Sequence, residues 1–324
     1  MTIFLGVVMA IALVIAYLCR DEAESAADRR LAVALVGLVV AISGRQLVWT
    51  YVGFEVVALT LLPVRARTMV GSAVALSGLV VVAFSSGGTD LAFLPSTWQV
   101  LVGLCLFEAG IAAKWLEWRR EDPGVFAATG VAVVSLFVRV WAWAPSQAEA
   151  LSLWIGVAAS FAMVAAGLSA IASRERSSLA SALIVSAVGF GVLATAGGPP
   201  ALPGLLLHVA AATITASILR PGLPSPVLWV VLLSLASMPP LPGFITKFAL
   251  IAQLPPWAAA AALVGICLVG IGCARALPTT PDASMASRRT RWLAAIVAVL
   301  ITVGLGWLPE LAHEFAVRAA TSLF

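Results

Sequence analysis

The sequence predicts an all-α fold: a polytopic bundle of about twelve transmembrane helices, arranged as two inverted five-helix repeats with a broken helix in the second. Of the 324 residues, 62% are apolar and only 10% are charged, a composition that excludes a soluble globular domain. Apolar runs of roughly 17–25 residues alternate with short polar links, as expected for helices that cross a bilayer. Three prolines and a glycine inside the apolar run 226–254 indicate where one helix breaks, because proline removes a backbone donor.

The polar links set the expected topology. Links on one side of the bundle carry nearly all of the arginines, whereas those on the other side carry no Lys or Arg; Arg45 and Arg318 are the exceptions. Because positively charged loops stay in the cytoplasm, this alternation predicts a multi-pass protein of the inner (cytoplasmic) membrane with both termini outside. The expected spans are roughly 2–18, 31–44, 46–64, 68–86, 98–116, 125–144, 150–172, 179–196, 201–219, 226–254, 256–276 and 291–308.

No cofactor, metal ion or nucleic acid is expected. The four cysteines have no metal-ligand spacing and are interpreted as small packing residues. There is no haem-like pair of histidines within one span and no Gly-rich nucleotide loop, so any oxidation chemistry would lie on partner subunits. The pI near 9.2 arises from loop arginines and therefore reflects topology rather than nucleic-acid binding.

The two lysines of the chain, Lys114 and Lys247, both fall within apolar runs, although the other basic residues are all arginines. The proton affinity of a lysine amine responds readily to desolvation, whereas arginine stays charged. Lys247 follows the predicted helix break, and an ionisable group beside a discontinuous helix indicates an ion path. The alternative is a lysine whose amine extends to the membrane interface. The residues of the break are Pro239, Pro240, Pro242 and Gly243.

Other ionisable residues within the spans are candidates for a proton path. A charge at the bilayer centre costs about 3 kcal/mol, so each requires a partner or a function. Glu55 is expected to pair with Lys114, while Glu117, three residues after Lys114, can reach it or serve as an interfacial cap. His208 is either a relay residue, since imidazole titrates near neutral pH, or a hydrogen-bonded core residue. Possible accessory residues are Glu108, Glu117 and Arg139.

An internal repeat relates the two lysines. Five spans between 31 and 144 form one unit and five between 150 and 276 form another, and an odd number of helices makes the two units inverted. Both lysines fall on the fourth helix of their unit, and inverted repeats with broken helices are typical of secondary transporters. The first unit has no proline near Lys114, so its fourth helix can be continuous. The remaining segments are 1–30, with one span, and 277–324, with a final span and an interfacial helix.

Three stretches resemble one known family. Ser237–Phe248 (SMPPLPGFITKF) resembles the S-x-x-G-I-P-P-x-x-G-F-x-x-K-F signature of antiporter-like proton-pumping subunits, which occur in respiratory complex I, Mrp-type sodium/proton antiporters and membrane-bound hydrogenases. Segment 42–55 looks like the family helix that carries an essential glutamate, and 110–114 looks like its partner-lysine helix. The resemblance is closest to the N-type subunit of complex I and covers the chain from about Leu31, with two N-terminal spans of the usual family pattern lacking.

This resemblance implies a proton-translocating subunit of a larger redox-driven or ion-transporting complex, with other membrane subunits, lipids and protons (or Na⁺) as partners. It implies that Glu55 and Lys114 form a modulating ion pair, that His208 lies on a central hydrophilic axis, and that Lys247 is the terminal proton-exchange residue. A mid-helix lysine of the family is replaced by Arg139, which cannot release a proton at physiological pH. The alternatives are a degenerate, non-conducting structural or coupling subunit, and a cation/proton or inorganic-carbon transporter component.

Overall fold

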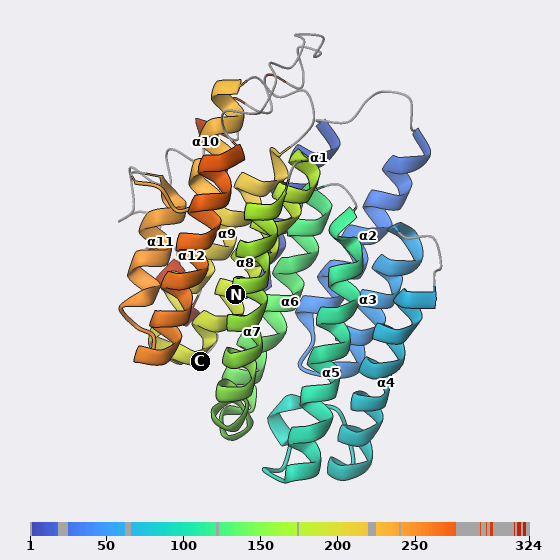
Figure 1. The fold of residues 1–324 in the computed structure, drawn as a ribbon. Helices are drawn as coiled ribbons and strands as arrows, with labels where there is room; N and C mark the ends of the chain where they lie inside the picture. Colours follow the sequence, from blue (N-terminus) through green and yellow to red (C-terminus); the bar gives the residue numbers. More distant parts are fainter. Residues whose placement is uncertain are drawn as a thin grey trace.

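The protein is an α-helical bundle whose helices lie roughly side by side (Figure 1). The computed structural model describes residues 2–18, 25–61, 66–120, 123–173, 175–219, 225–239 and 241–276, with isolated positions from Trp292 onward. The predicted all-α membrane bundle is confirmed. Its helices are α1 (Thr2–Leu18), α2 (Ser25–Ser43), α3 (Leu47–Leu61), α4 (Ala66–Ser86), α5 (Trp98–Glu117), α6 (Pro123–Trp143), α7 (Pro145–Ala172), α8 (Arg176–Ala194), α9 (Leu202–Ser217), α10 (Ser225–Leu235), α11 (Pro242–Ile251) and α12 (Pro256–Ala276).

The helices follow the expected spans closely. The run 226–254 forms two helices, α10 and α11, separated by the predicted break. Seven helices of the described segments are long and apolar enough to cross a membrane, and several shorter ones are apolar as well. The final expected span, 291–308, falls largely outside the described residues, as does most of 277–324. The twelve-span count, the inverted repeats and the four segment boundaries therefore stay predictions.

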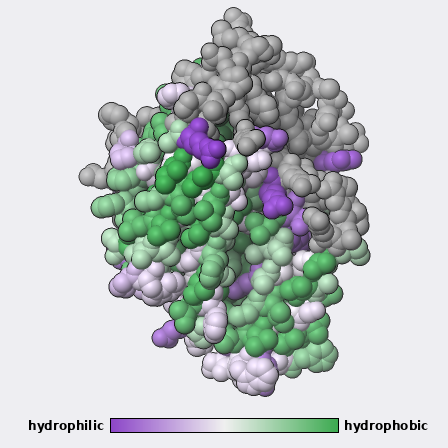
Figure 2. Space-filling model, viewed as in Figure 1, coloured by the Kyte–Doolittle hydropathy of each residue, from purple (hydrophilic) through white to green (hydrophobic). Residues whose placement is uncertain are grey.

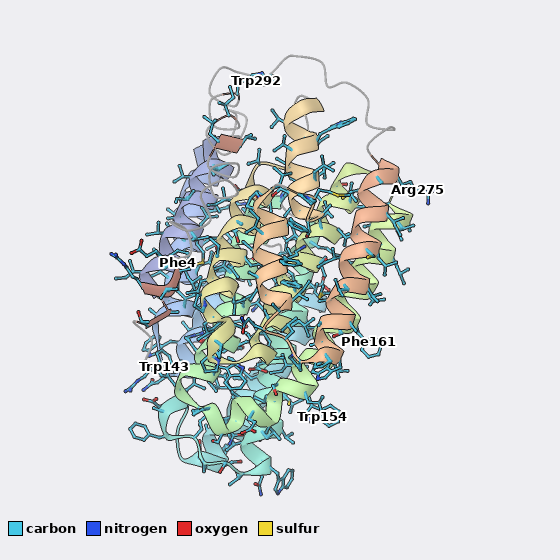
Figure 3. All side chains as sticks on the ribbon, turned by 90° about the vertical axis from the view of Figure 1, so that its left-hand side faces the viewer. Phe4, Trp143, Trp154, Phe161, Arg275 and Trp292 are labelled. Carbon is cyan, nitrogen blue, oxygen red and sulfur yellow. The ribbon has the colours of Figure 1, made fainter. Side chains whose placement is uncertain are left out.

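The outer surface of the bundle is apolar, as a lipid-facing surface must be. Figure 2 shows hydrophobic residues over most of the coloured face, with hydrophilic residues in small groups. Phe161 on α7 is 72% exposed on this outer surface. Arg275 lies at one end of the bundle, whereas Trp143 and Trp154 lie toward the other (Figure 3). Tryptophan commonly occupies membrane interfaces, and the protein is accordingly a membrane protein.

Helices α4 and α5 pack with their backbones in direct contact. A Cβ atom on Gly78 would collide with the backbone of Phe107, and one on Gly110 would collide with the backbone of Ala75. A Cβ on Gly71 would lie 2.9 Å from the backbone nitrogen of Lys114. Small residues permit such close approach between membrane helices. This packing places Lys114 directly against α4.

The turn between α2 and α3 is held against the link between α4 and α5. The backbone N–H of Leu47 donates to the Thr89 carbonyl at 2.9 Å, and that of Leu91 donates to the Arg45 carbonyl at 3.2 Å. The Arg45 guanidinium lies 3.6 Å from the Asp90 carboxylate. Arg45, an exception to the arginine pattern of the links, thus has a local partner at this end of the bundle.

Candidate functional site

The first polar cluster surrounds Lys114 and joins three helices. The Lys114 amine on α5 lies 2.6 Å from Oε1 of Glu55 on α3, and it donates a hydrogen bond to Oγ of Ser72 on α4 at 2.8 Å. The Lys114 side chain is 1% exposed and that of Glu55 is 27% exposed. The ion pair expected from the sequence is therefore present. It neutralises a buried ammonium that would otherwise be unfavourable at this depth.

Two further acidic residues of α5 have different surroundings. Glu117 is the last residue of the helix, at its end rather than at the cluster, and the Lys114 amine is directed toward Glu55 instead. Glu108 is buried, and neither of its carboxylate oxygens has a hydrogen-bond partner in the part of the chain that the structure describes. The helix itself is continuous from Trp98 to Glu117, as the absence of a nearby proline suggests.

Arg139 on α6 is fully buried and holds the turn between α2 and α3. Its Nη1 donates to the Gly44 carbonyl at 2.6 Å and its Nη2 to Oγ1 of Thr50 at 2.8 Å. Its Nε donates to the carbonyl of Ser135 at 3.3 Å within α6. Thr50 in turn donates to the Ala41 carbonyl at 3.2 Å. Three of the five N–H groups of the guanidinium therefore donate structural hydrogen bonds.

We expect Arg139→Lys to lower the free energy of unfolding by about 2 kcal/mol, because one amine cannot bridge acceptors in the turn after α2, on α3 and on α6 as a planar guanidinium does. The measurement is an SDS titration in mixed micelles that follows helix content. Arg275→Lys is the control, since Arg275 is exposed and donates one hydrogen bond, to the Ile171 carbonyl. Equal stabilities of the two variants would contradict the bridging role of Arg139.

The second cluster begins at the helix break. Helix α10 ends in a Schellman motif, in which the N–H of Met238 donates to the Leu233 carbonyl at 2.9 Å and the N–H of Ser237 donates to the Ser234 carbonyl at 3.0 Å. Ser237 has a φ angle of 68°, a left-handed conformation that glycine usually supplies at this position. Of the predicted break residues, Pro239 lies in the link, Pro242 and Gly243 begin α11, and Pro240 lies outside the described residues.

Lys247 on α11 reaches back to the broken end of α10. Its amine donates to the Leu235 carbonyl at 3.2 Å, one of the carbonyls that a helix end leaves without an intrahelical partner. The amine also lies 5.7 Å from the centre of the Phe190 ring, and the residue is 2% exposed. Lys247 therefore does not extend to the membrane interface; its amine is held within the bundle by neutral groups.

His208 on α9 lies next to this cluster. Its Nε2 is 2.9 Å from the Ala187 carbonyl, and because a carbonyl only accepts, Nε2 carries the proton of a neutral imidazole. Its Nδ1 is then an acceptor, 3.4 Å from Oγ1 of Thr246. His208 and Lys247 line one small cavity together with Ser234 and Leu235. The cavity has room for about one water molecule.

The structure thus brings the predicted residues together as two pairs, Glu55 with Lys114 and His208 with Lys247. Sequence reasoning missed Ser72 and Thr246, which complete the two clusters. Thr246 immediately precedes Lys247, and a hydroxyl beside a buried lysine was a usable signal, whereas Ser72 had no sequence signal. Among the described residues no group of three His, Cys, Asp or Glu side chains is placed to hold a metal ion.

Three solved structures share this fold over almost the whole chain. A chain of the Mrp complex from Dietzia sp. DQ12-45-1b has a TM-score of 0.79 and 18% identity, covering 99% of this chain and 83% of that chain. A chain of respiratory complex I from Thermus thermophilus with bound aureothin has a TM-score of 0.78 and 18% identity, covering 97% and 85%. A chain of the membrane-bound sulfane sulfur reductase, an archaeal respiratory membrane complex, has a TM-score of 0.80 and 16% identity, covering 98% and 80%.

The comparisons show the fold of the chain. No protein-family model and no curated protein matches the sequence, so the likeness is carried by the structure. The chain has the fold of the membrane subunits found in these multi-subunit complexes. The fold implied by the sequence resemblance to antiporter-like subunits is therefore confirmed.

Proposed function

We propose that the chain is a proton-translocating, antiporter-like subunit of a larger redox-driven or ion-transporting complex in the inner membrane, with both termini outside. The observation that carries this proposal is Lys247: a buried amine at a helix break, held by a neutral carbonyl and sharing a small cavity with a histidine. A buried lysine held without a carboxylate can exchange its proton at modest cost. Other membrane subunits and lipids would surround the chain.

The second cluster is arranged for proton transfer from the amine nitrogen of Lys247 to a ring nitrogen of His208. Nδ1 is the unprotonated ring nitrogen of His208 when Nε2–H is bonded to the Ala187 carbonyl, so Nδ1 can accept a proton. The proton released by Lys247 is accepted at Nδ1, either directly across the cavity or through the Thr246 hydroxyl 3.4 Å from Nδ1. The amine then accepts a new proton from the side of the break. The first step exchanges an N–H bond of Lys247 for one of His208. In the second step, water at the break gives up a proton to the amine, and the His208 imidazolium passes its proton to water on the far side, so that both groups return to their starting states. No step requires a redox group.

The first cluster modulates the same process. While Glu55 lies against Lys114, the ammonium is stabilised and keeps its proton. Separation of the two groups, driven by a neighbouring subunit, leaves a buried cation without its counter-charge and favours proton release. We propose H⁺ as the ion, because the Lys247 amine and the His208 imidazole, which line one cavity, are groups that bind and release protons. Glu117 would serve as an accessory residue at the end of α5.

A non-conducting structural or coupling subunit is the second candidate. Arg139 favours it, since the guanidinium on α6 is fixed by three hydrogen bonds and cannot release a proton. In this alternative the lysine clusters would stabilise packing between helices without ion movement. A stand-alone cation/proton or inorganic-carbon transporter would instead be purified as an active single chain.

The test compares Lys247→Met with Lys247→Arg. Both variants should reduce proton flux by about tenfold or more, because neither side chain can release a proton, although arginine keeps the positive charge. The tagged chain is purified gently with the subunits that accompany it and reconstituted in vesicles that contain a pH-sensitive dye. Phe248→Ala is the matched control, since the neighbouring Phe248 is 67% exposed. Normal flux in an assembled Lys247→Arg complex would contradict proton translocation and favour the structural candidate.

A further inference from the structure

Glu108 is the buried acid that neither lysine cluster uses. It lies on α5 and is 4% exposed, and both of its carboxylate oxygens lack a hydrogen-bond partner within the described part of the chain. Three other carboxylates of the described residues form ion pairs: Glu55 with Lys114, Asp90 with Arg45, and Glu314 with Arg318. Among the described residues, Glu108 is therefore a buried carboxyl group without a counter-charge.

Among the side chains that the structure describes on α4 to α7, the two basic ones, Lys114 and Arg139, are bonded elsewhere. Helix α5 packs along α4 and also contacts α6 and α7. On α5 itself, the Lys114 amine is bound to Glu55 and Ser72. On α6, the Arg139 guanidinium is directed to the turn between α2 and α3. Cys105, one turn earlier on α5, is a titratable neighbour of Glu108 but supplies no positive charge.

A carboxylate in this position would be strongly disfavoured. Removing an ion from water costs several kcal/mol even after the protein relaxes, and here no opposite charge offsets that cost. A group in such a site takes up a proton and becomes neutral instead. We propose that Glu108 holds a proton at neutral pH and is a proton-storage residue of the first half of the chain.

The state of Lys114 can control whether Glu108 holds its proton. It follows Glu108 by six residues, a rise of about 9 Å along the helix. After Lys114 separates from Glu55 and releases its proton, the neutral amine can accept the stored proton: the O–H bond of Glu108 breaks as an N–H bond of Lys114 forms, and the new ammonium stabilises the Glu108 carboxylate. When the pair with Glu55 re-forms, Glu108 loses that stabilisation and binds a proton again. This role in transfer rests on the proposed function, whereas the protonated state of Glu108 does not.

Infrared spectroscopy tests the protonated state directly. The carbonyl stretch of a neutral carboxylic acid is separate from the bands of a carboxylate and of the amide backbone. The purified protein with its accompanying subunits should show this band at neutral pH, and Glu108→Gln, which preserves the shape of the side chain, should lose it. Glu149→Gln on α7 is the matched control and should keep the band, because the Glu149 side chain is exposed and lies outside both lysine clusters. Wild-type protein without such a band overturns the proposal without recourse to any variant, as does a band that persists in Glu108→Gln.

Flux measurements on the same samples test the role in transfer. Glu108→Gln should lower proton flux by about tenfold while leaving assembly of the complex intact. Normal flux in this variant overturns the storage role. If the band disappears in Glu108→Gln but Lys247→Met retains normal flux, then the protonated state of Glu108 stands and the proposed function fails. The two failures are therefore distinguishable.

Discussion

Glu55→Gln is expected to lower the free energy of unfolding by about 3 to 5 kcal/mol, since removal of one partner leaves a buried charge uncompensated. The Lys114 amine would keep Ser72 Oγ at 2.8 Å but would lose the carboxylate oxygen at 2.6 Å. A hydroxyl cannot balance an ammonium ion that is 1% exposed. The measurement is an SDS titration in mixed micelles, followed by far-UV circular dichroism.

A double variant distinguishes the contribution of the ion pair to stability from that of side-chain packing. Glu55→Gln combined with Lys114→Met has no charge left in the cluster, and it should regain at least half of the stability that Glu55→Gln loses. Lys114→Met alone should cost less than Glu55→Gln, because the remaining Glu55 side chain is 27% exposed and can be hydrated. A double variant that is less stable than both single variants would contradict the charge argument.

Gly243→Ala is expected to destabilise the protein by about 3 kcal/mol, because a methyl group at this position meets the backbone of α10. The Cβ atom would collide with the carbonyl oxygen of Ser234. That oxygen already accepts the Ser237 N–H that closes α10, so it cannot move without opening the cap. The added methyl must therefore push α11 away from α10, which also separates the Lys247 amine from the Leu235 carbonyl.

Gly270→Ala is the matched control for Gly243→Ala. It lies within α12, and a Cβ there would meet nothing within 4 Å. Alanine is favoured over glycine inside a helix by about 1 kcal/mol, so this variant should be as stable as the wild type or more stable. Thermal unfolding in detergent compares the two variants at the same glycine-to-alanine change. Comparable losses for both would contradict the close approach at Gly243.

Most of the helical framework could be predicted from the sequence, because membrane helices follow the length and hydropathy of apolar runs. The helix break was also predictable, because Pro239, Pro240 and Pro242 lack the backbone N–H that a residue inside a helix donates. The pairing of Glu55 with Lys114 was also accessible, because a buried cation requires a partner and Glu55 was a suitable carboxylate. Each of these inferences uses the sequence of one helix or the need of a buried charge for a partner of opposite charge.

The finer arrangement depends on packing between helices and could not be read from the sequence. Arg139 appeared as a candidate for the ion path, but its hydrogen bonds to Gly44 and Thr50 depend on how α6 crosses the turn between α2 and α3. The contact of Thr246 with His208 likewise depends on how α11 meets α9. No hydropathy pattern specifies such contacts, because they join residues that are distant in the sequence.

The glycine contacts between α4 and α5 have a mechanical consequence. Where two backbones touch at Gly71, Gly78 and Gly110, no layer of side chains remains that could slide or re-interdigitate. The two helices therefore form one rigid unit, and neither can slide along the other. Any movement that separates Lys114 from Glu55 must therefore come from rotation of the Lys114 side chain or from displacement of α3, while α4 and α5 stay fixed relative to each other.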